Sequence, residues 1–332
     1  MPPTKPTLTD VARLAGVSEI TVSRVVRGKG PIAEETRQRV RGAIEALGYV
    51  PNRAAGTLAS SASLFIGVIL PSMHNIVFPE VLRGIYEGLA GSPYQPLLGV
   101  SEYDREKEQE ILSSLLAWQP MAIITAGSDH TDVTRRLLRE SGVRVVELMD
   151  TEGDPVDLVV GFSHRQAGYD SGRHLIARGY RRIGYVGHDW VADRRARLRY
   201  EGLVAALAEA GLTLAAEVHV DGPSSVTGGA EMLARLLAGA DIDAAVFVND
   251  DMAVGGYFHC LAAGIAVKEE LALFGFNGLD IGQAIPMPLS TVRSNRFEIG
   301  RIAAGRIIAE PRRPAETEVV NTGYEIIEGA TA

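Results

Sequence analysis

Short apolar runs alternate with amphipathic helical patterns from residue 64 onward, and this alternation constrains the fold more than any other feature of the chain. The apolar runs predict strands at 64–70, 97–100, 121–125, 143–148, 158–162, 183–186, 244–248 and 271–276. The helical patterns that lie between most of them are 80–90, 106–118, 165–178, 198–210, 230–238 and 253–263. Strands that alternate with helices in this way form parallel sheets covered by helices on both faces.

The alternating units fall into two groups of similar size. Residues 64–160 with 291–320 predict one lobe, and residues 161–290 with the C-terminal strands predict a second. We therefore expect a doubly wound α/β core of two lobes over residues 64–332. Ligands of such sheets bind at the carboxyl ends of the strands, so the cleft between the lobes is the expected binding site.

The N-terminal part has a different pattern, in which two short helices are joined by a Gly turn. Thr7 can cap the first helix, Gly16 permits the sharp turn, and Ser18 can cap the second helix. A third helix is expected at 34–47. The side chains expected to face inward are Val11, Leu14, Ala15, Val22, Val25, Val26, Val40, Ala43, Ile44 and Leu47. This pattern predicts an all-α helix-turn-helix head over residues 1–50.

The second helix would carry Ile20, Arg24 and Arg27 on its outward face. A helix with such a face can enter the major groove of DNA. The planar guanidinium of Arg24 matches the O6 and N7 acceptors of guanine, and a good bidentate pair discriminates between bases by about 1 to 3 kcal/mol. Residues 1–62 carry a net charge of +4 and the remainder carries −12, so the basic end is the one expected to bind DNA.

The residues at 17–18, 21–25 and 48–54 closely resemble the start of the lac repressor family of bacterial transcription regulators, and the resemblance continues to the C-terminus. It implies a periplasmic-binding-protein-like core, a pseudo-palindromic DNA operator, a small-molecule effector, and assembly as a homodimer or a tetramer. The positions expected to contact DNA are Thr7, Ser18, Glu19, Ile20, Thr21, Ser23, Arg24, Arg27, Asn52, Arg53 and Leu58.

A hinge is expected at residues 51–63, between the head and the core. Residues 53–61 are too small and polar to bury enough surface to hold a helix alone, so their order must come from DNA and a second subunit. By resemblance, Leu58 would be the apolar wedge that enters the minor groove at the operator centre. The alternative is that Leu58 packs against the core.

Polar residues stand where the expected cleft would be. Asp150, Asn249, Asp250 and Asn277 follow predicted strands, and Arg199 opens a predicted helix. Helix capping would explain Asp250, whereas positions of the lac repressor family that match the other four contact sugar ligands. With the loop after the first strand included, the expected effector contacts are Asn75, Val77, Phe78, Asp150, Arg195, Arg199, Asn249 and Asn277.

Asn277 departs from the pattern of many sugar-binding members of the family, which carry Asp at this position. A neutral Asn beside Arg199 and the cationic run 194–197 removes repulsion against an anionic ligand. The stretches 75–85, 146–150 and 275–283 look most like the gluconate-utilisation repressor branch. A sugar acid such as gluconate is therefore the preferred effector. A neutral sugar or another small metabolite is the alternative, and a sugar-binding protein without DNA function is a further one.

Other function classes find little support in the sequence. Residues 28–33 formally match G-x-G-x-x-A but open no βαβ unit, and neither a P-loop, nor G-x-S-x-G, nor a zinc-ligand spacing is present. We therefore expect no enzyme activity, no catalytic residue, no cofactor and no metal. The apolar runs are too short for a membrane span, no leader pattern stands at the N-terminus, and Cys260 is the single cysteine. These features predict a cytoplasmic protein without disulfides or membrane contact.

Overall fold

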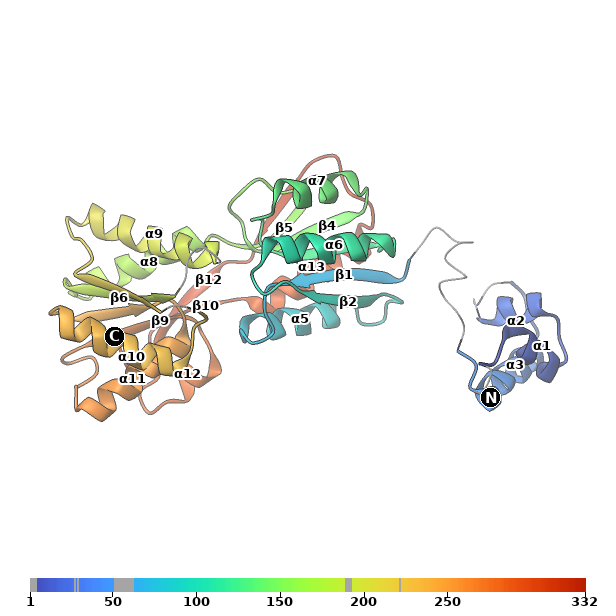
Figure 1. Ribbon diagram of the computed structural model, residues 1–332, viewed down its shortest axis with the longest axis horizontal. Helices are drawn as coiled ribbons and strands as arrows, with labels where there is room; N and C mark the ends of the chain where they lie inside the picture. The colour runs from blue at the N-terminus through green and yellow to red at the C-terminus, as the bar shows by residue number, and fades with distance from the viewer. Residues whose placement is uncertain (1–4, 27, 29, 51–62, 189–192, 221) are drawn as a thin grey trace. The chain divides into compact units, whose positions relative to one another are not determined.

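The computed structural model describes residues 5–26, 28, 30–50, 63–188, 193–220 and 222–332. The chain divides into two compact units, residues 1–62 and residues 63–332, and each is described by itself (Figure 1). The first unit is the helical head and the second is the α/β core. None of the helices in the described ranges is long and apolar enough to cross a membrane.

The head consists of helices α1 (Leu8–Ala15), α2 (Glu19–Val26) and α3 (Glu34–Leu47). Thr7 and Asp10 form a capping box at the start of α1, and Gly16 ends this helix with a left-handed φ of 65°. A small apolar core joins the three helices, and its buried members are Val11, Ala12, Ala15, Val22, Val25, Val40 and Ala43. The predicted three-helix head is therefore present.

Two residues expected to face inward are exposed instead. Leu14 is 56% exposed and Val26 is 37% exposed. Helix α1 turns Val11, Ala12 and Ala15 toward the core, so Leu14 lies beside the buried face rather than within it. Val26 is the last residue of α2, beyond the buried pair Val22 and Val25.

Lobe 1 of the core begins with strands and helices that alternate up to its fourth strand. Its elements are β1 (Phe65–Leu70), α5 (Val77–Gly88), β2 (Gln95–Val100), α6 (Arg105–Ala117), β3 (Ala122–Ala126), α7 (Asp132–Glu140), β4 (Arg144–Asp150) and β5 (Leu158–Phe162). A later helix, α13 (Arg296–Ala309), and a later strand, β11 (Glu318–Asn321), complete this lobe. The sheet is fully parallel, in the order β11-β5-β4-β3-β1-β2.

Lobe 2 repeats the same arrangement. Its elements are α8 (His164–Ala177), β6 (Ile183–His188), α9 (Arg194–Glu209), β7 (Ala216–Val220), α10 (Val226–Gly239), β8 (Ala244–Phe247), α11 (Asp250–Ala263), β9 (Ala272–Asn277), α12 (Asp280–Ala284), β10 (Ser290–Ser294) and β12 (Tyr324–Ile327). The strand order is β12-β10-β9-β8-β6-β7. In both lobes helices cover the two faces of the sheet, with α5 and α13 opposite α6 and α7 in lobe 1 (Figure 1).

The chain passes between the lobes after β5, after β10 and after β11. Residues 291–294 were expected in lobe 1, but they belong to β10, which pairs with β9 in lobe 2. This strand has the sequence Ser-Thr-Val-Arg-Ser and lacks the apolar run that marks a strand in the sequence. The predicted parallel sheets are present, and one edge strand departs from this arrangement, because β12 runs antiparallel to β10.

Glycines let two pairs of helices pack backbone against backbone. In lobe 2 a Cβ atom on Gly168 of α8 would lie 1.9 Å from the carbonyl oxygen of Arg199 on α9. In lobe 1 a Cβ on Gly84 of α5 would lie 2.0 Å from the carbonyl oxygen of Phe297 on α13. In each lobe the pair contains the helix that follows the first strand of the sheet, which is α9 or α5. Its partner is the helix that begins where the chain enters the lobe, which is α8 or α13. The glycines therefore fix the start of α8 and of α13 against a neighbouring helix.

Candidate functional site

The outward face of the head carries the residues expected to contact DNA. Ser18, Glu19, Ile20 and Arg24 are exposed on or just before α2, and Ile20 is 67% exposed although it is apolar. Thr7 is exposed as well, and Thr21 and Ser23 are partly exposed. An exposed isoleucine beside an exposed arginine suits a groove that offers both methyl groups and acceptor atoms.

Two of these side chains also have local roles. The Ser18 hydroxyl accepts a hydrogen bond from the Thr21 backbone N–H at 3.2 Å, so it caps α2 as expected. Glu19 accepts a hydrogen bond from the Thr9 hydroxyl at 2.7 Å and thereby ties α2 to α1. Arg27, Asn52, Arg53 and Leu58 lie outside the described residues, and their roles remain predictions.

Helix α9 supplies the cationic wall of the cleft, and it begins earlier than expected. Asp193 caps the helix by accepting from the backbone N–H groups of Arg195 and Ala196, so the first turn starts at Arg194 and Arg199 lies in the second turn. Burial alone would raise the pKa of Asp193, but the charges of Arg195 and Arg199 outweigh it and lower the pKa well below its ordinary value. The cap therefore also neutralises part of the arginine charge.

Arg199 is almost fully buried, with 8% of its surface exposed. One terminal nitrogen donates to the carbonyl oxygen of Val248 at 3.3 Å, and the other faces Nδ1 of His164 at 3.2 Å. Its guanidinium lies over the ring of Phe276, 4.4 Å from the centroid. Burial and the neighbouring arginine charges lower the pKa of His164 far below its ordinary value, so the imidazole is neutral and can accept from Arg199.

Asn249 and Asn277 are brought together at the carboxyl ends of β8 and β9. Asn277 Nδ2 donates to Asn249 Oδ1 at 3.0 Å, and Asn249 Nδ2 donates to the hydroxyl of Ser224 at 3.1 Å. Asn249 makes no side-chain bond that would cap α11. This relay leaves Asn277 Oδ1 as an acceptor for a ligand.

Asp250 does not act as the helix cap that the sequence suggested. Its carboxylate accepts hydrogen bonds from the Thr291 hydroxyl and from the Leu279 backbone N–H, both at 2.6 Å. It thus fastens the loop after β9 to β10. Burial raises the pKa of Asp250 to about 7, because these two hydrogen bonds only partly offset the loss of solvent.

The lobe 1 residues expected to contact the effector bind other residues of the chain in this structure. Asp150 at the end of β4 forms an ion pair with Arg194 of α9, and it accepts a hydrogen bond from the Glu152 N–H at 2.9 Å. Phe78 is buried on α5, and the Arg195 guanidinium lies 5.2 Å from the centroid of its ring. These two contacts join the lobes across the cleft.

The other two lobe 1 contacts flank this junction. Val77 is 5% exposed at the start of α5, where its N–H donates to Asn75 Oδ1. Asn75 Nδ2 in turn donates to the Tyr103 hydroxyl at 3.2 Å. Asn75 therefore fixes the loop after β1, and Val77 contributes to the core more than to an open surface.

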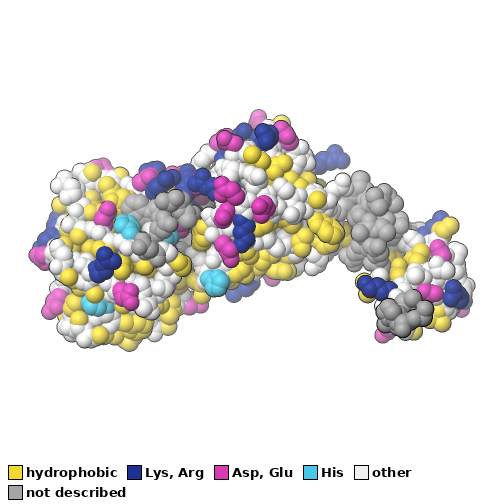
Figure 2. All heavy atoms as spheres, in the orientation of Figure 1, with side chains coloured by type: hydrophobic (Ala, Val, Ile, Leu, Met, Phe, Trp, Pro, Cys, Tyr) yellow, Lys and Arg dark blue, Asp and Glu magenta, His cyan; other side chains and the backbone are white. Residues whose placement is uncertain are grey.

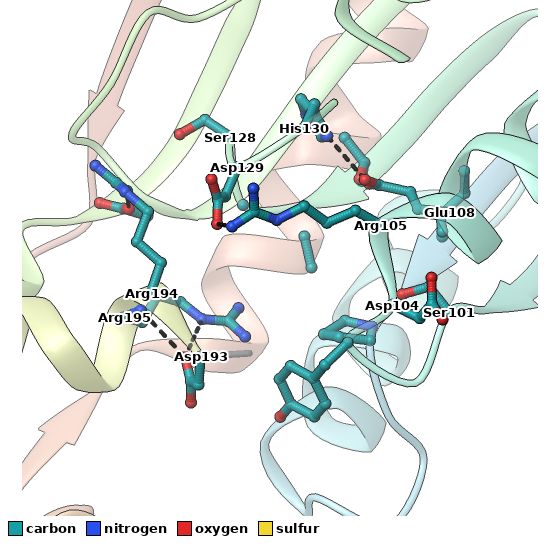
Figure 3. A pocket seen from close by; sticks show the side chains of 17 residues that line it. Ser101, Asp104, Arg105, Glu108, Ser128, Asp129, His130, Asp193, Arg194 and Arg195 are labelled. Carbon is teal, nitrogen blue, oxygen red and sulfur yellow. Dashed lines mark hydrogen bonds and ion pairs between the residues drawn. The ribbon is translucent and has the colours of Figure 1, made fainter. Parts of the chain in front are cut away.

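A pocket of about 590 Å³, partly open to solvent, adjoins these residues on the lobe 1 side. It lies beside the point where the strand order reverses between β1 and β3, where doubly wound sheets bind ligands. Arg194 and Arg195 enter it from α9, opposite a wall that carries both acidic and basic side chains (Figure 3). The wall residues that the sequence analysis missed are Ser101, Tyr103, Asp104, Arg105, Glu108, Ser128, Asp129 and His130. Most of them follow β2 and β3, so the strand-end rule could have found them.

His130 sits between two carboxylates at the floor of this pocket. Its Nδ1 lies 3.1 Å from Glu108 and its Nε2 lies 3.5 Å from the fully buried Glu147. Burial alone would lower the pKa of His130, but the hydrogen bonds and charges of Glu108 and Glu147 outweigh it and raise the pKa to about 9. The cluster therefore contains a protonated imidazole at neutral pH.

On the face of the core in Figure 2, acidic and basic side chains are interspersed.

Comparison with known proteins agrees with both units. Residues 7–52 match the family of bacterial regulatory proteins called the lacI family. Residues 63–322 match the periplasmic binding proteins and sugar binding domain of the LacI family. The transcriptional regulator GntR of Pseudomonas aeruginosa is 40% identical over 326 residues, with 97% of this chain and 94% of the relative covered. The regulator IdnR of Escherichia coli K12 is 35% identical, with 98% of both covered.

Solved structures give the same answer. A LacI family regulator from Silicibacter pomeroyi is 41% identical with a TM-score of 0.93, and the match covers 98% of this chain and 99% of that one. The lac repressor dimer bound to operator shares the fold, with a TM-score of 0.85 at 24% identity over 99% of both chains. The chain belongs to the LacI family of bacterial regulatory proteins.

Proposed function

We propose that this protein is an operator-binding transcription regulator whose effector is a small sugar acid such as gluconate. The anionic class of the effector is inferred from how the arginines of α9 are paired with carboxylates. Arg194 pairs with Asp150 and Arg195 pairs with Asp193, whereas no carboxylate in the described ranges lies within 4.0 Å of the Arg199 nitrogens. The Nε atom of Arg199 also has no hydrogen-bond partner among the described residues.

A buried guanidinium without a close carboxylate is costly, and an anionic ligand would supply the missing partner. The ligand carboxylate would bind Arg199, and its hydroxyls would be read by Asn249 and Asn277. Asn277 Oδ1 can accept from a hydroxyl without adding a negative charge beside the ligand. An Asp at position 277 would offer a further acceptor oxygen, but its negative charge would repel an anionic ligand.

Calorimetry with gluconate and with a neutral hexose tests the effector class. Arg199→Ala should weaken gluconate binding by about 2 to 5 kcal/mol, because the ligand charge would be left unpaired in a buried site. The matched control is Arg197→Ala, since Arg197 is half exposed on the same helix and pairs with Glu201. A parent that prefers the hexose, or an Arg199→Ala variant that binds gluconate as well as the parent, contradicts the proposal. Thermal unfolding of each variant separates a lost ligand contact from a lost fold.

A mobility-shift titration tests the DNA arm. Arg24→Ala should lower affinity for the selected operator by about 1 to 3 kcal/mol and bring it closer to the affinity for random DNA. Arg41→Ala, exposed on α3, is the control. Unchanged operator affinity in Arg24→Ala would show that α2 is not the groove-reading helix. Leu58→Ala should weaken operator binding while gluconate affinity stays nearly unchanged.

The family relatives above are transcriptional regulators, and we infer that this chain likewise regulates rather than catalyses. Bacterial operator DNA lies in the cytoplasm, so we infer that the protein acts there. We also propose that it binds as a homodimer, because one three-helix head reads too few bases alone. Incubation of the protein with gluconate should give no turnover.

A further inference from the structure

Arg296 occupies the crossing between β10 and α13, as the first residue of the helix. Its side chain is 8% exposed and holds both lobes. Nε and Nη2 lie 2.8 Å and 2.7 Å from one carboxylate oxygen of Glu80 on α5. Nη1 donates to the main-chain oxygen of Asn277 in lobe 2. One buried guanidinium therefore connects a proposed effector contact with a helix of the other lobe.

The Asn277 end of this connection is under conformational constraint. Asn277 has a φ of 110°, which is outside the region that a residue with a side chain ordinarily adopts. Arg296 holds its carbonyl, and Asp250 holds the N–H of Leu279 two residues later. A ligand that pulls on the Asn277 side chain must therefore also act on the backbone that Arg296 binds.

The Glu80 end leads into a rigid pair of helices. A Cβ on Gly300 of α13 would lie 2.0 Å from the carbonyl oxygen of Val81, the residue after Glu80. Together with the contact at Gly84, this packing leaves the two helices no room to slide independently. A displacement of Arg296 must therefore move α5 as well.

The crossing after β5 repeats this arrangement with a different side chain. His164 is the first residue of α8, and its Nε2 donates to the main-chain oxygen of Met149 at 3.0 Å, at the end of β4 in lobe 1. Its Nδ1 faces Arg199 of α9. Met149 also has a positive φ, of 78°. At each of these two crossings, the first residue of the helix binds a main-chain oxygen at the end of a strand in the lobe that the chain has left. The same side chain also contacts the helix that follows the first strand of the lobe that the chain enters.

We propose that Arg296 transmits effector binding at Asn277 to helix α5 of lobe 1, and thereby couples the cleft to operator binding. This inference rests on the proposed function, because it takes Asn277 as an effector contact. Arg296 acts through Asn277 and Glu80, so it is a positioning and coupling residue. It need not touch the ligand itself.

The first experiment measures coupling in the full-length chain. The dissociation constant of gluconate is determined by calorimetry with and without operator DNA, and the ratio of the two constants is the coupling factor. Such factors are typically about 5- to 150-fold. In Glu80→Gln and in Arg296→Met the factor should fall toward 1, while gluconate still binds the DNA-free protein. The control Glu298→Gln removes an exposed ion pair within α13, between Glu298 and Arg301, and should leave the factor unchanged.

The second experiment does not depend on which effector the protein takes. Hydrogen exchange of residues 277–282 should be faster in Glu80→Gln than in the parent, because the guanidinium that holds the Asn277 carbonyl has lost its anchor. Glu298→Gln should exchange like the parent. Glu80 is about one-third exposed, so its variant keeps the test available if Arg296→Met does not fold.

The two experiments separate the possible failures. If the parent does not bind gluconate, the proposed effector is wrong, and the exchange measurement still decides the role of Arg296. If exchange over 277–282 in Glu80→Gln equals that of the parent, the connection through Arg296 is refuted. If gluconate binds and both variants keep the parent coupling factor, it is refuted as well.

Discussion

Replacing Gly168 with Ala should destabilise the core, although the same change in most helices is stabilising. The new Cβ would lie 1.9 Å from the carbonyl oxygen of Arg199, whereas close carbon–oxygen contacts measure about 3.3 to 3.6 Å. Helices α8 and α9 must therefore separate by more than about 1 Å. The obstacle is backbone, which cannot move aside by changing rotamer.

The expected size follows from two opposing effects. Overpacking of this kind costs about 1 to 3 kcal/mol, and alanine returns up to about 1 kcal/mol of helix propensity. Because the obstacle is backbone, the upper part of the overpacking cost applies, and the net loss is about 2 kcal/mol. For a domain of this size each kcal/mol lowers the melting temperature by about 2 to 4 °C. Gluconate binding should weaken too, because the residue that is pushed away carries the proposed carboxylate partner.

Gly305→Ala is the matched control. Gly305 lies in the interior of α13, and apart from its chain neighbours and the backbone of its own helix no described atom comes within 4 Å of where its Cβ would sit. This variant should gain about 0.5 to 1 kcal/mol and bind gluconate like the parent. Thermal unfolding and calorimetry on both variants give the answer. A Gly168→Ala protein that melts at or above the parent temperature would refute the close approach of α8 and α9.

Two further predictions concern charge. The folded pKa of His130, about 9, lies above its ordinary value of 6.5, so its contribution to stability is complete below pH 6.5 and is lost as the pH rises through 9. Denaturant unfolding from pH 6 to 10 should show a fall in the free energy of unfolding, and His130→Gln should reduce this fall. An equal fall in both proteins would refute the assignment. Asp193→Asn keeps a good helix cap but removes a carboxylate that faces the arginines, so calorimetry should show tighter gluconate binding, while the ligand-free protein loses roughly 2 kcal/mol of stability. Weaker gluconate binding in this variant would contradict the charge argument.

The sequence was sufficient for the strands that lie inside the sheets, with the exception of the polar strand β10. Strands buried on both faces are continuous apolar runs, as in β1 and β5, and such runs stand out from their surroundings. The strands and helices that were missed are amphipathic or polar. β7 and β12 are edge strands with only partial burial, and α7 has a largely charged sequence with two buried residues.

The site was predictable to the extent that it follows strand ends. Asn249 and Asn277 were found in this way, and they contact each other. The start of α9 was misplaced, because four arginines within six residues obscure the apolar pattern, and the cap at Asp193 was not recognised. The ion pair between Asp150 and Arg194 could not be foreseen, since the two residues lie on different lobes and the sequence does not show how the lobes face each other.

The points at which the chain crosses between the lobes also determine how a truncated protein would behave. The last strand of each sheet comes from the final residues, since β11 completes lobe 1 and β12 completes lobe 2. Thr331 adds two further hydrogen bonds to Leu273 on β9. A chain cut after Ala309 would lose less than a tenth of its length and yet would uncover the edges of β5 and β10 together. Uncovered edges pair with other chains, so a late nonsense mutation would yield an aggregating product rather than a protein with one working lobe.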